Sequence, residues 1–205
     1  MQATAQSGAG ARRTFTDTAR RAQIVRAATG TIAELGYRNA SFAQIAKRAG
    51  LSSTGLISYH FDSRNELIGQ VVADILAAIG AHMSQRMAHV SSATEALRTY
   101  IEANAEFTGS HREEMTALLE IFLGGGFRYD ATSEHAALAP IEGILREGQR
   151  SGEFRGFDPK VMATLIQRSV DGLPFLLAAE PDVDPRRYGA EAATAFYLAT
   201  RAEPI

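Results

Sequence analysis

The chain has 205 residues, 45% of them hydrophobic, so it can bury a core as one helical domain or as a small domain joined to a larger one. It has no cysteine, which excludes disulfides and thiolate chemistry, and we find neither an apolar run of about 18 residues nor the apolar segment of a signal peptide. The net charge of −2 is uneven: residues 1–70 hold nine Lys and Arg against four Asp and Glu, and residues 71–205 hold twelve against nineteen. We therefore expect a soluble, cytoplasmic protein with a basic amino-terminal part that can meet phosphates.

Residues 1–13 are small, polar and rich in alanine and glycine, which predicts a disordered arm. Arg12 and Arg13 end this arm. They either approach the backbone or minor groove of DNA, or they only keep a tail soluble.

A first helix is predicted from Thr16 or Thr18 to residue 35, because its apolar residues recur on one face. A short second helix begins after Ser41, whose hydroxyl forms a capping box with Gln44. Gly50 ends this second helix, because a residue without a Cβ adopts the left-handed conformation at no steric cost.

A third helix follows the turn and ends by Phe61. Ser52 or Ser53 is expected to cap it, and Leu56 and Ile57 are expected to face inward. Its outward positions carry hydrogen-bonding and small residues, namely Thr54, Gly55, Ser58, Tyr59 and His60. Such a helix pair suits the reading of base edges in a major groove, although an ordinary helical hairpin would show the same pattern.

The segment from Thr18 to Leu67 resembles the DNA-binding domain of the TetR family of transcriptional regulators. The resemblance rests on the Gly36-Tyr37 step, the run IAKRAGLS, and YHF followed by Ser-basic-x-Glu-Leu, and it covers about a quarter of the chain. The common family spacing between the second helix and YHF is one residue shorter, which leaves the outward register of the third helix open.

The resemblance implies an all-α fold with two domains. A helix-turn-helix DNA-binding domain would occupy residues 14–66, and a helical ligand-binding and dimerisation domain residues 67–205. The DNA-contacting residues it implies are Ser41, Ser52, Ser53, Thr54, Gly55, Ser58, Tyr59, His60 and Arg64.

A long helix is predicted from the capping box of Ser63 and Glu66 to near Met87. A helix of this length can connect a DNA-binding part to a body. Arg64 in its first turn opposes the helix dipole, which indicates either a phosphate partner or a solvated surface residue.

The rest of the chain has helical apolar spacing and no strand alternation. Helical segments are predicted after Ser92 up to residue 123, and over residues 133–150, 159–179 and 185–201, with Pro174 bending the third of these four segments. Gly124-Gly125-Gly126 lacks the Gly-Lys-Ser/Thr ending of a phosphate loop, so we interpret it as a flexible connection.

By resemblance, the body binds a small molecule among its central helices and pairs with a second copy through its last two helices. The candidate effector residues are Tyr100, Phe107, His111, Met115, Leu119, Phe122 and Phe127, with Tyr129 beside them; each could instead be plain core. Their aromatic and methionine side chains indicate an apolar or aromatic effector, with His111 as a polar anchor. The candidate dimer residues are Leu165, Ser169, Leu173, Leu176, Tyr188, Ala192 and Phe196, on helices that are apolar on more than one face.

The sequence contains no pattern that predicts catalysis. The five histidines lack metal-ligand spacing, Glu113, Glu114 and Glu120 favour a solvated helix face, and no Gly-x-Ser-x-Gly elbow occurs. We predict a regulator without cofactor or metal that represses transcription as a homodimer on a palindromic DNA operator and is released by a small-molecule effector, with no membrane partner. The alternative is a helical small-molecule-binding protein or enzyme without DNA-binding activity.

Overall fold

The computed structural model describes the backbone of residues 6–128 and 130–202, and the side chains of residues 17–128 and 130–202. Within these ranges the regular elements are all α-helices, which confirms the predicted all-α class, and one isolated bridge joins Phe154 and Arg201. The chain forms two compact units. The amino-terminal unit comprises Met1–Ile75 and Thr116–Phe127, and the body unit comprises Leu76–Met115 and Arg128–Ile205.

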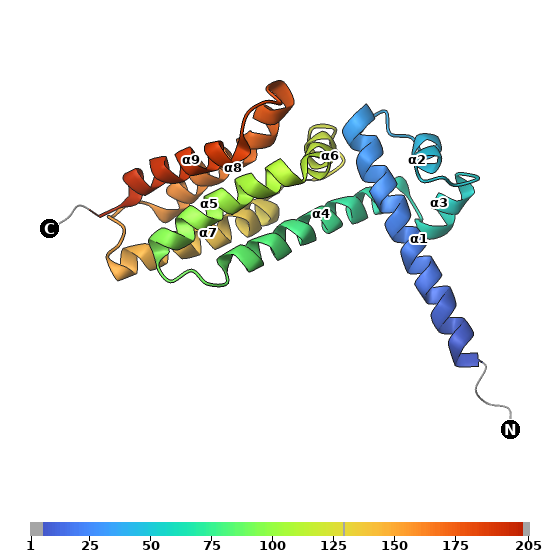
Figure 1. Ribbon diagram of the computed structural model, residues 1–205, viewed down its shortest axis with the longest axis horizontal. Helices are drawn as coiled ribbons and strands as arrows, with labels where there is room; N and C mark the ends of the chain where they lie inside the picture. The colour runs from blue at the N-terminus through green and yellow to red at the C-terminus, as the bar shows by residue number, and fades with distance from the viewer. Residues whose placement is uncertain (1–5, 129, 203–205) are drawn as a thin grey trace. The chain divides into compact units, whose positions relative to one another are not determined.

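The amino-terminal unit is built from three complete helices and parts of two others (Figure 1). These are α1 (Gln6–Leu35), α2 (Phe42–Arg48), α3 (Gly55–His60), the start of α4 (Arg64–Met87) and the end of α6 (Arg112–Leu123). Its core consists of side chains that are at most 2% exposed: Ile24, Ile32, Ile45, Ile57, Phe61 and Leu67. Because these side chains come from successive helices, burying them fixes α2 and α3 against α1 and α4.

Helix α1 begins at Gln6, ahead of the start expected at Thr16 or Thr18, so part of the segment expected to be a disordered arm is helical. A helix nucleated in the packed part of α1 can extend through this alanine-containing segment, since propagation costs less than nucleation. Residues 1–5 and the side chains of Arg12 and Arg13 lie outside the described parts of the chain.

The capping box at the start of α2 is confirmed. The Ser41 hydroxyl accepts from the Gln44 backbone N–H at 3.4 Å, and the Ser41 N–H donates to Gln44 Oε1 at 2.9 Å. Gly50 then takes a left-handed φ of 65°, as its position after the helix predicts.

The prediction of a serine cap on α3 is wrong, because Thr54 occupies the cap position and its side chain makes no capping hydrogen bond. Thr54 has helical backbone angles, whereas a capping side chain needs an extended backbone to reach back to the first turn. Only Ile57 of the two expected inward residues is buried; Leu56 is 37% exposed, since this six-residue helix presents one side chain to the core.

Helix α4 starts with a capping box that is shifted by one residue. The Ser63 hydroxyl accepts from the Glu66 N–H at 3.1 Å, but the Glu66 carboxylate accepts from the Asp62 N–H at 2.6 Å. By length and composition alone, α4 is apolar enough to cross a membrane, a test that core helices of soluble proteins also pass. Its residues Leu67, Val71 and Ile75 are buried in the protein core.

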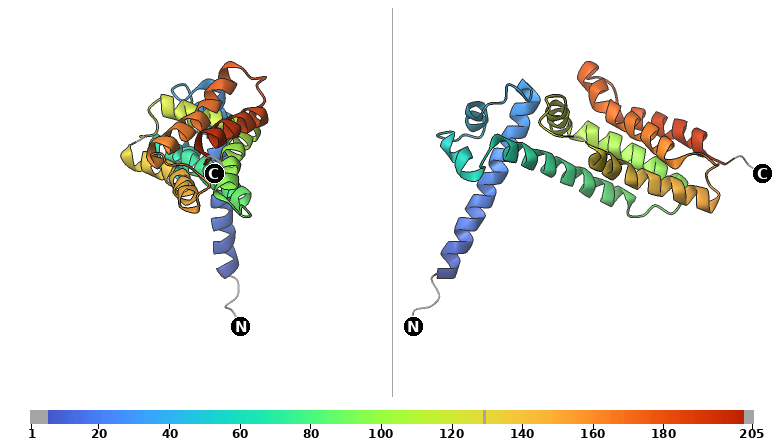
Figure 2. Two further views of the ribbon diagram at one scale, coloured as in Figure 1. Left: turned by 90° about the vertical axis from the view of Figure 1, so that its left-hand side faces the viewer. Right: turned by 180° about the vertical axis from the view of Figure 1, so that it is seen from behind.

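In the body unit, α5 (Ala93–Ser110) packs against α7 (Ala131–Ser151), α8 (Pro159–Ala179) and α9 (Pro185–Thr200), as Figures 1 and 2 show. Side-chain caps are present at the start of two of these helices. The Ser92 hydroxyl accepts from the Glu95 N–H at the start of α5, and Asp158 before Pro159 caps α8. The main core contains Leu97, Ile101, Ile141, Leu145 and Ile166.

Candidate nucleic-acid interface and effector site

The exposed face of α3 and of the turn before it carries the residues expected to read DNA. Ser52, Ser53, Thr54, Gly55 and Ser58 are exposed, and Tyr59 is 75% exposed, with its ring meeting the edge of the His60 ring at 5.0 Å. Ile57, on the opposite side, is fully buried. One short helix thus presents hydroxyls, a phenol and an imidazole while a single isoleucine fixes it to the core.

Two α1 side chains that sequence reasoning missed hold the ends of α2 and α3. Arg21 donates to the His60 carbonyl and to the Glu66 carboxylate, and lies 4.1 Å from the Phe61 ring centroid. The Asp62 N–H first, and then Arg21, lower the pKa of Glu66. Gln23 donates to the Ala49 carbonyl at 2.7 Å. These contacts fix the orientation of the reading helix relative to α1.

Ser41 and Arg64, both predicted to contact DNA, have contacts within the unit. The Ser41 hydroxyl belongs to the α2 cap. Arg64 donates to the Tyr37 carbonyl, and its guanidinium lies 4.4 Å above the Tyr37 ring. Arg64 therefore orders the α1–α2 turn, and this contact also explains a cation in the first turn of α4.

Other cations of the amino-terminal unit are more open to solvent. Arg38 and Lys47 are exposed, and among the described side chains they show no ion pair, whereas Arg48 is paired with Glu34 at 2.6 Å. Lys47 lies in the last turn of α2, the helix that crosses the DNA backbone in helix-turn-helix proteins. Its place in the IAKRAGLS run, at the end of the second predicted helix, is a sequence signal for phosphate contact.

The seven residues predicted to contact the effector do not fall in one unit. Tyr100, Phe107, His111 and Met115 belong to the body unit, whereas Leu119, Phe122 and Phe127 belong to the amino-terminal unit. Phe122 is 46% exposed, and Tyr129 lies outside the described residues. Four of the seven predicted residues thus belong to the body unit, on α5, on the residue that follows it and at the start of α6.

Phe107 lies between two histidines in the body unit. The His111 ring stacks on it at 4.0 Å with an interplanar angle of 6°, and the His82 ring lies at 5.6 Å and 56°. His111 Nδ1 is within hydrogen-bonding distance of Ser110 Oγ, at 2.9 Å. His82 Nε2 is buried and has no hydrogen-bond partner among the described residues. An unpaired buried nitrogen is costly, which makes His82 a candidate polar anchor.

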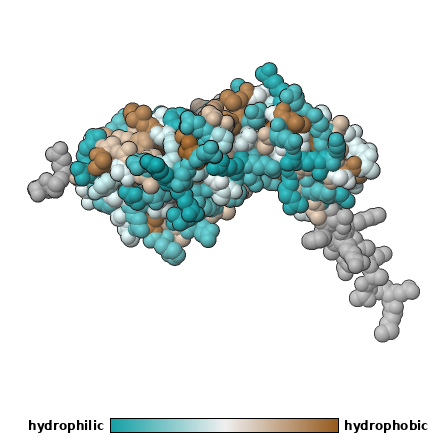
Figure 3. All heavy atoms as spheres, turned by 45° about the horizontal axis from the view of Figure 1, so that its top comes forward, coloured by the Kyte–Doolittle hydropathy of each residue, from teal (hydrophilic) through white to brown (hydrophobic). Residues whose placement is uncertain are grey.

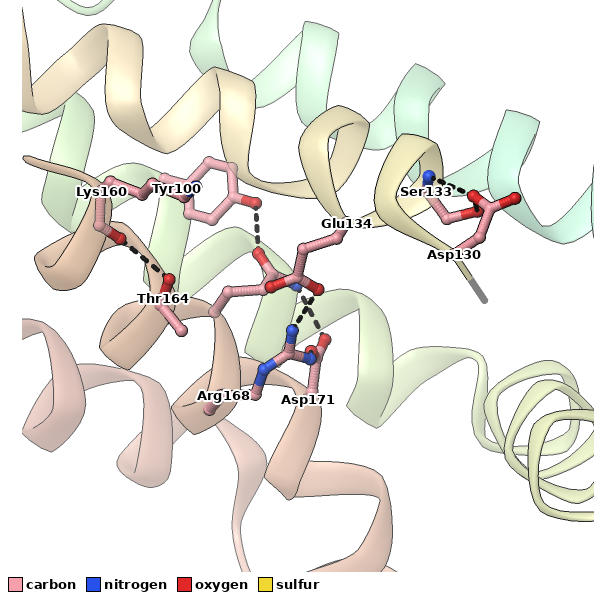
Figure 4. A network of polar contacts seen from close by, with 9 residues as sticks. Tyr100, Asp130, Ser133, Glu134, Lys160, Thr164, Arg168 and Asp171 are labelled. Atoms are coloured by element: carbon pink, nitrogen blue, oxygen red, sulfur yellow. Dashed lines mark hydrogen bonds and ion pairs between the residues drawn. The ribbon is translucent and has the colours of Figure 1, made fainter. Parts of the chain in front are cut away.

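Tyr100 begins a second polar cluster between α5, α7 and α8 (Figure 4). Its hydroxyl donates to Gln167 Oε1 at 3.1 Å, and Gln167 Nε2 donates to Asp171 at 2.7 Å. Arg168 joins Asp171, at 2.9 Å, to Glu134. Burial raises the pKa of Tyr100 to about 12, so its hydroxyl keeps its proton, and burial also raises the pKa of Asp171. Sequence spacing pointed to Tyr100 but to none of its partners.

Most of the predicted dimer residues pack within their own protomer. Leu173 is buried, Leu176 and Tyr188 pack around it, and Ala192 and Phe196 pack against the main body core. The Tyr188 hydroxyl donates to the Ser169 carbonyl at 2.6 Å. Of the predicted set, Leu165 is strongly exposed, and it shares this exposure with other large apolar side chains of α8 and α9: Val161, Phe175 and Leu198.

The described part of the chain contains no group of three His, Asp or Glu residues that could hold a metal ion. The candidate sites in this part of the chain are thus three: the exposed hydrogen-bonding face of α3, the aromatic and histidine cluster in the body unit, and the apolar surface of α8 and α9.

Comparison with known proteins identifies the family. A model of bacterial regulatory proteins of the tetR family matches residues 24–71. The HTH-type transcriptional regulator BetI of Yersinia pestis is 36% identical over 158 residues, which cover 75% of this chain and 76% of the relative. The BetI of Cronobacter sakazakii is 35% identical over 105 residues, a match that spans only 52% of that relative.

Solved structures agree with the fold. A transcriptional regulator from Saccharomonospora viridis in complex with choline has a TM-score of 0.79 and 20% identity, over 91% of this chain and all of that chain. The match to the Yersinia regulator extends well beyond the helix-turn-helix into the body. The chain therefore belongs to the TetR family of bacterial regulatory proteins, and it is a transcriptional regulator of the helix-turn-helix type.

Proposed function

We propose that this protein represses transcription as a homodimer on a near-palindromic operator and that a small molecule bound in the body releases it. The observation that carries the proposal is the exposed hydrogen-bonding face of α3, fixed to the core by Ile57. In a two-fold dimer, two such helices enter successive major grooves about 34 Å apart. Lys47 and Arg38 supply exposed cations for phosphate contacts.

The exposed apolar surface of α8 and α9 supports the dimer. Val161, Leu165, Phe175 and Leu198 are each about half exposed in the protomer, and Figure 3 shows apolar surface among the polar surface of the body. Large apolar side chains on two long helices are costly in water, and a symmetry-related copy can cover them. We place the dimer contact on these residues rather than on Leu173 or Phe196, which the protomer core already uses.

The effector site is proposed around Phe107 in the body unit. Phe107 is a buried aromatic residue beside His82, and His82 Nε2 offers one hydrogen bond that no described residue satisfies. These features favour a small molecule with an apolar or aromatic portion and one hydrogen-bonding group. Choline, bound in the Saccharomonospora structure, has three methyl groups and one hydroxyl and is therefore a rational first probe.

We assign residues 14–66 to DNA binding and residues 67–205 to effector binding and dimerisation, with action in the cytoplasm and without catalysis. The effector can shift operator occupancy only by its difference in affinity between the DNA-binding and released states, typically about 1 to 3 kcal/mol.

The experiment that tests the proposal is selection of DNA by the purified protein. Sheared genomic fragments from the host are incubated with the protein, retained and sequenced. We expect enrichment of an inverted repeat whose half-sites lie about one helical turn, roughly 10 base pairs, apart. Failure of the folded wild-type protein to enrich any sequence would overturn the proposal in favour of a helical small-molecule-binding protein.

The effector is tested by melting and operator release with choline and with phenol as a ring-containing probe. A ligand of the native state raises the melting temperature as its concentration exceeds its dissociation constant. An effector must in addition lower the affinity for the selected operator fragment. A probe that raises the melting temperature without releasing DNA is a ligand but not an effector.

A further inference from the structure

Tyr37 is a buried aromatic residue on the turn between α1 and α2, and it is held from two directions within the amino-terminal unit. On one side, Arg64 at the start of α4 covers its ring and donates to its carbonyl. On the other side, the end of α6 meets the ring and the backbone N–H. Glu120, near the end of α6 and 83 residues after Tyr37 in the chain, thus contacts the turn that leads into α2.

The three glycines after α6 form a specific helix ending that accommodates this ring. The Gly126 N–H donates to the Ile121 carbonyl at 2.8 Å and the Gly125 N–H to the Phe122 carbonyl at 3.2 Å, while Gly125 has a left-handed φ of 77°. These are the two hydrogen bonds of a Schellman motif. The segment is therefore an ordered cap, and the prediction of a flexible connection is wrong.

Two of these glycines are required by the closeness of Tyr37. A Cβ added to Gly124 would lie 2.3 Å from Tyr37 Cδ1, and one added to Gly126 would lie 2.5 Å from Tyr37 Cε2 and Cζ. Neither glycine has a positive φ, so the obstacle to a side chain is contact with neighbouring atoms. These are the Tyr37 ring at both positions and, at Gly124, also the Glu120 carbonyl oxygen at 2.9 Å.

Glu120, one turn before Gly124, completes the contact. Its Oε2 accepts from the Tyr37 N–H at 3.3 Å and lies 3.1 Å from the position that a Cβ on Gly36 would occupy. The end of α6 therefore contacts the Gly36-Tyr37 step in two ways. The Glu120 carboxylate accepts from the Tyr37 N–H, and the glycine turn packs against the Tyr37 ring. We name Glu120 and Gly124–Gly126 the Tyr37 socket.

We propose that the Tyr37 socket is a positioning element of the DNA-reading unit, which fixes the turn between α1 and α2 and so the placement of the helix pair that follows it. The proposal rests on the function proposed above and adds a positioning role for residues outside the helix-turn-helix. A closely packed ring holds the turn in one place, since packed contacts resist deformation.

The test substitutes Gly126→Ala, with Gly69→Ala as its matched control. Gly69 lies on α4 in the same unit, and nothing lies within 4 Å of a Cβ added there. Each change is also made together with Tyr37→Leu, which removes the ring atoms that a Cβ on Gly126 would meet. The measurements are affinity for the operator fragment from the selection, melting temperature, and hydrogen exchange of the amides of residues 36–41.

We expect Gly126→Ala to weaken operator affinity about tenfold and Gly69→Ala to change it less than about twofold, with a smaller effect of Gly126→Ala in the Tyr37→Leu background. Amide exchange of residues 36–41 should rise in Gly126→Ala while exchange in α5 and α9 stays unchanged. Amide exchange at residues 36–41 is measured without DNA and in the single variant. It therefore shows whether the socket fixes the turn even if the double variant fails to fold.

Two outcomes would overturn the inference. The first is Gly126→Ala with wild-type operator affinity and wild-type exchange at residues 36–41. The second is a uniform rise in exchange over both units, which would mean that the socket only stabilises the fold. If the wild-type protein selects an operator in either case, the proposed function stands and only the socket fails.

Discussion

At the scale of single residues, Tyr59 separates DNA binding from folding most clearly, because its side chain is largely exposed while its neighbour Ile57 carries the packing. We predict that Tyr59→Ala weakens operator binding by about 1 to 3 kcal/mol, the range for loss of a good base contact. Its melting temperature should equal that of the wild-type protein. Operator titrations and thermal melts on one preparation check both statements, and unchanged affinity would remove Tyr59 from the interface.

Substitution of His82 should change the response to effector without lowering the melting temperature. Replacing a buried, unpaired polar group with an apolar one of similar shape is neutral or stabilising, so we predict that His82→Phe melts at or above the wild-type temperature while responding less to effector. His89→Phe is the matched control, since His89 is exposed. A clear drop in melting temperature for His82→Phe alone would show that the imidazole has a structural partner.

Local sequence patterns found the residues whose roles depend on close neighbours, such as Ser41 with Gln44 and the outward Ser58 and Tyr59 beside inward Ile57. They did not predict the contacts of Arg21 with His60 and of Arg64 with Tyr37, because these partners lie 39 and 27 residues away. Charge at a helix terminus indicated that Arg64 needed a partner, but only the fold shows that Tyr37 can be that partner.

At the scale of elements, the start of α5 depends on a carboxylate from the loop after α7. Glu153 accepts from the Thr94 N–H at 2.9 Å and from the Ala93 N–H at 3.1 Å, so it satisfies donors that the helix leaves unpaired. The Thr94 N–H, ahead of its other partners, lowers the pKa of Glu153 below its ordinary value of 4.5. The ionised form is therefore the one that stabilises the fold.

We predict that Glu153→Gln lowers the free energy of unfolding by about 1 kcal/mol at neutral pH, the scale of a charge at a helix amino terminus. A depressed folded-state pKa contributes stability above the unfolded value, and this contribution is lost as the pH falls through the folded value. The difference between wild type and variant should therefore vanish as the pH falls from 4.5 downward. Urea unfolding at a series of pH values measures it, and a constant difference would contradict the capping role.

Helix boundaries followed from sequence where the cap lies in nearby residues, as with Ser41 and Gln44 at the start of α2. They did not follow for α3, where Thr54 occupies the cap position without a capping bond. The glycine run after α6 was also misinterpreted, because its composition suits both a flexible linker and a close approach to a distant ring.

At the scale of the whole molecule, sequence patterns established the all-α class and two functional parts, but they assigned helix faces incompletely. Helices α8 and α9 are apolar on several faces, and spacing alone cannot tell which face meets the protomer core. The structure places Phe196 against that core and leaves Leu165 and Leu198 exposed.

We predict that Leu165→Glu produces a folded monomer, whereas Phe196→Glu destabilises the protomer itself. A charge at Leu165 stays hydrated in the protomer and becomes buried only when a second copy covers α8, whereas a charge at Phe196 replaces a side chain packed against the core. Leu123→Glu is the matched control, because Leu123 is similarly exposed but lies on α6. Sedimentation at micromolar concentration should show a dimer for the wild type and for Leu123→Glu, and a monomer with native circular dichroism for Leu165→Glu. The monomer should bind the operator fragment more weakly, because it offers one reading helix where the palindrome needs two. A Leu165→Glu protein that remains a dimer would move the contact to another face, and a wild-type monomer would remove the dimer from the proposed mechanism.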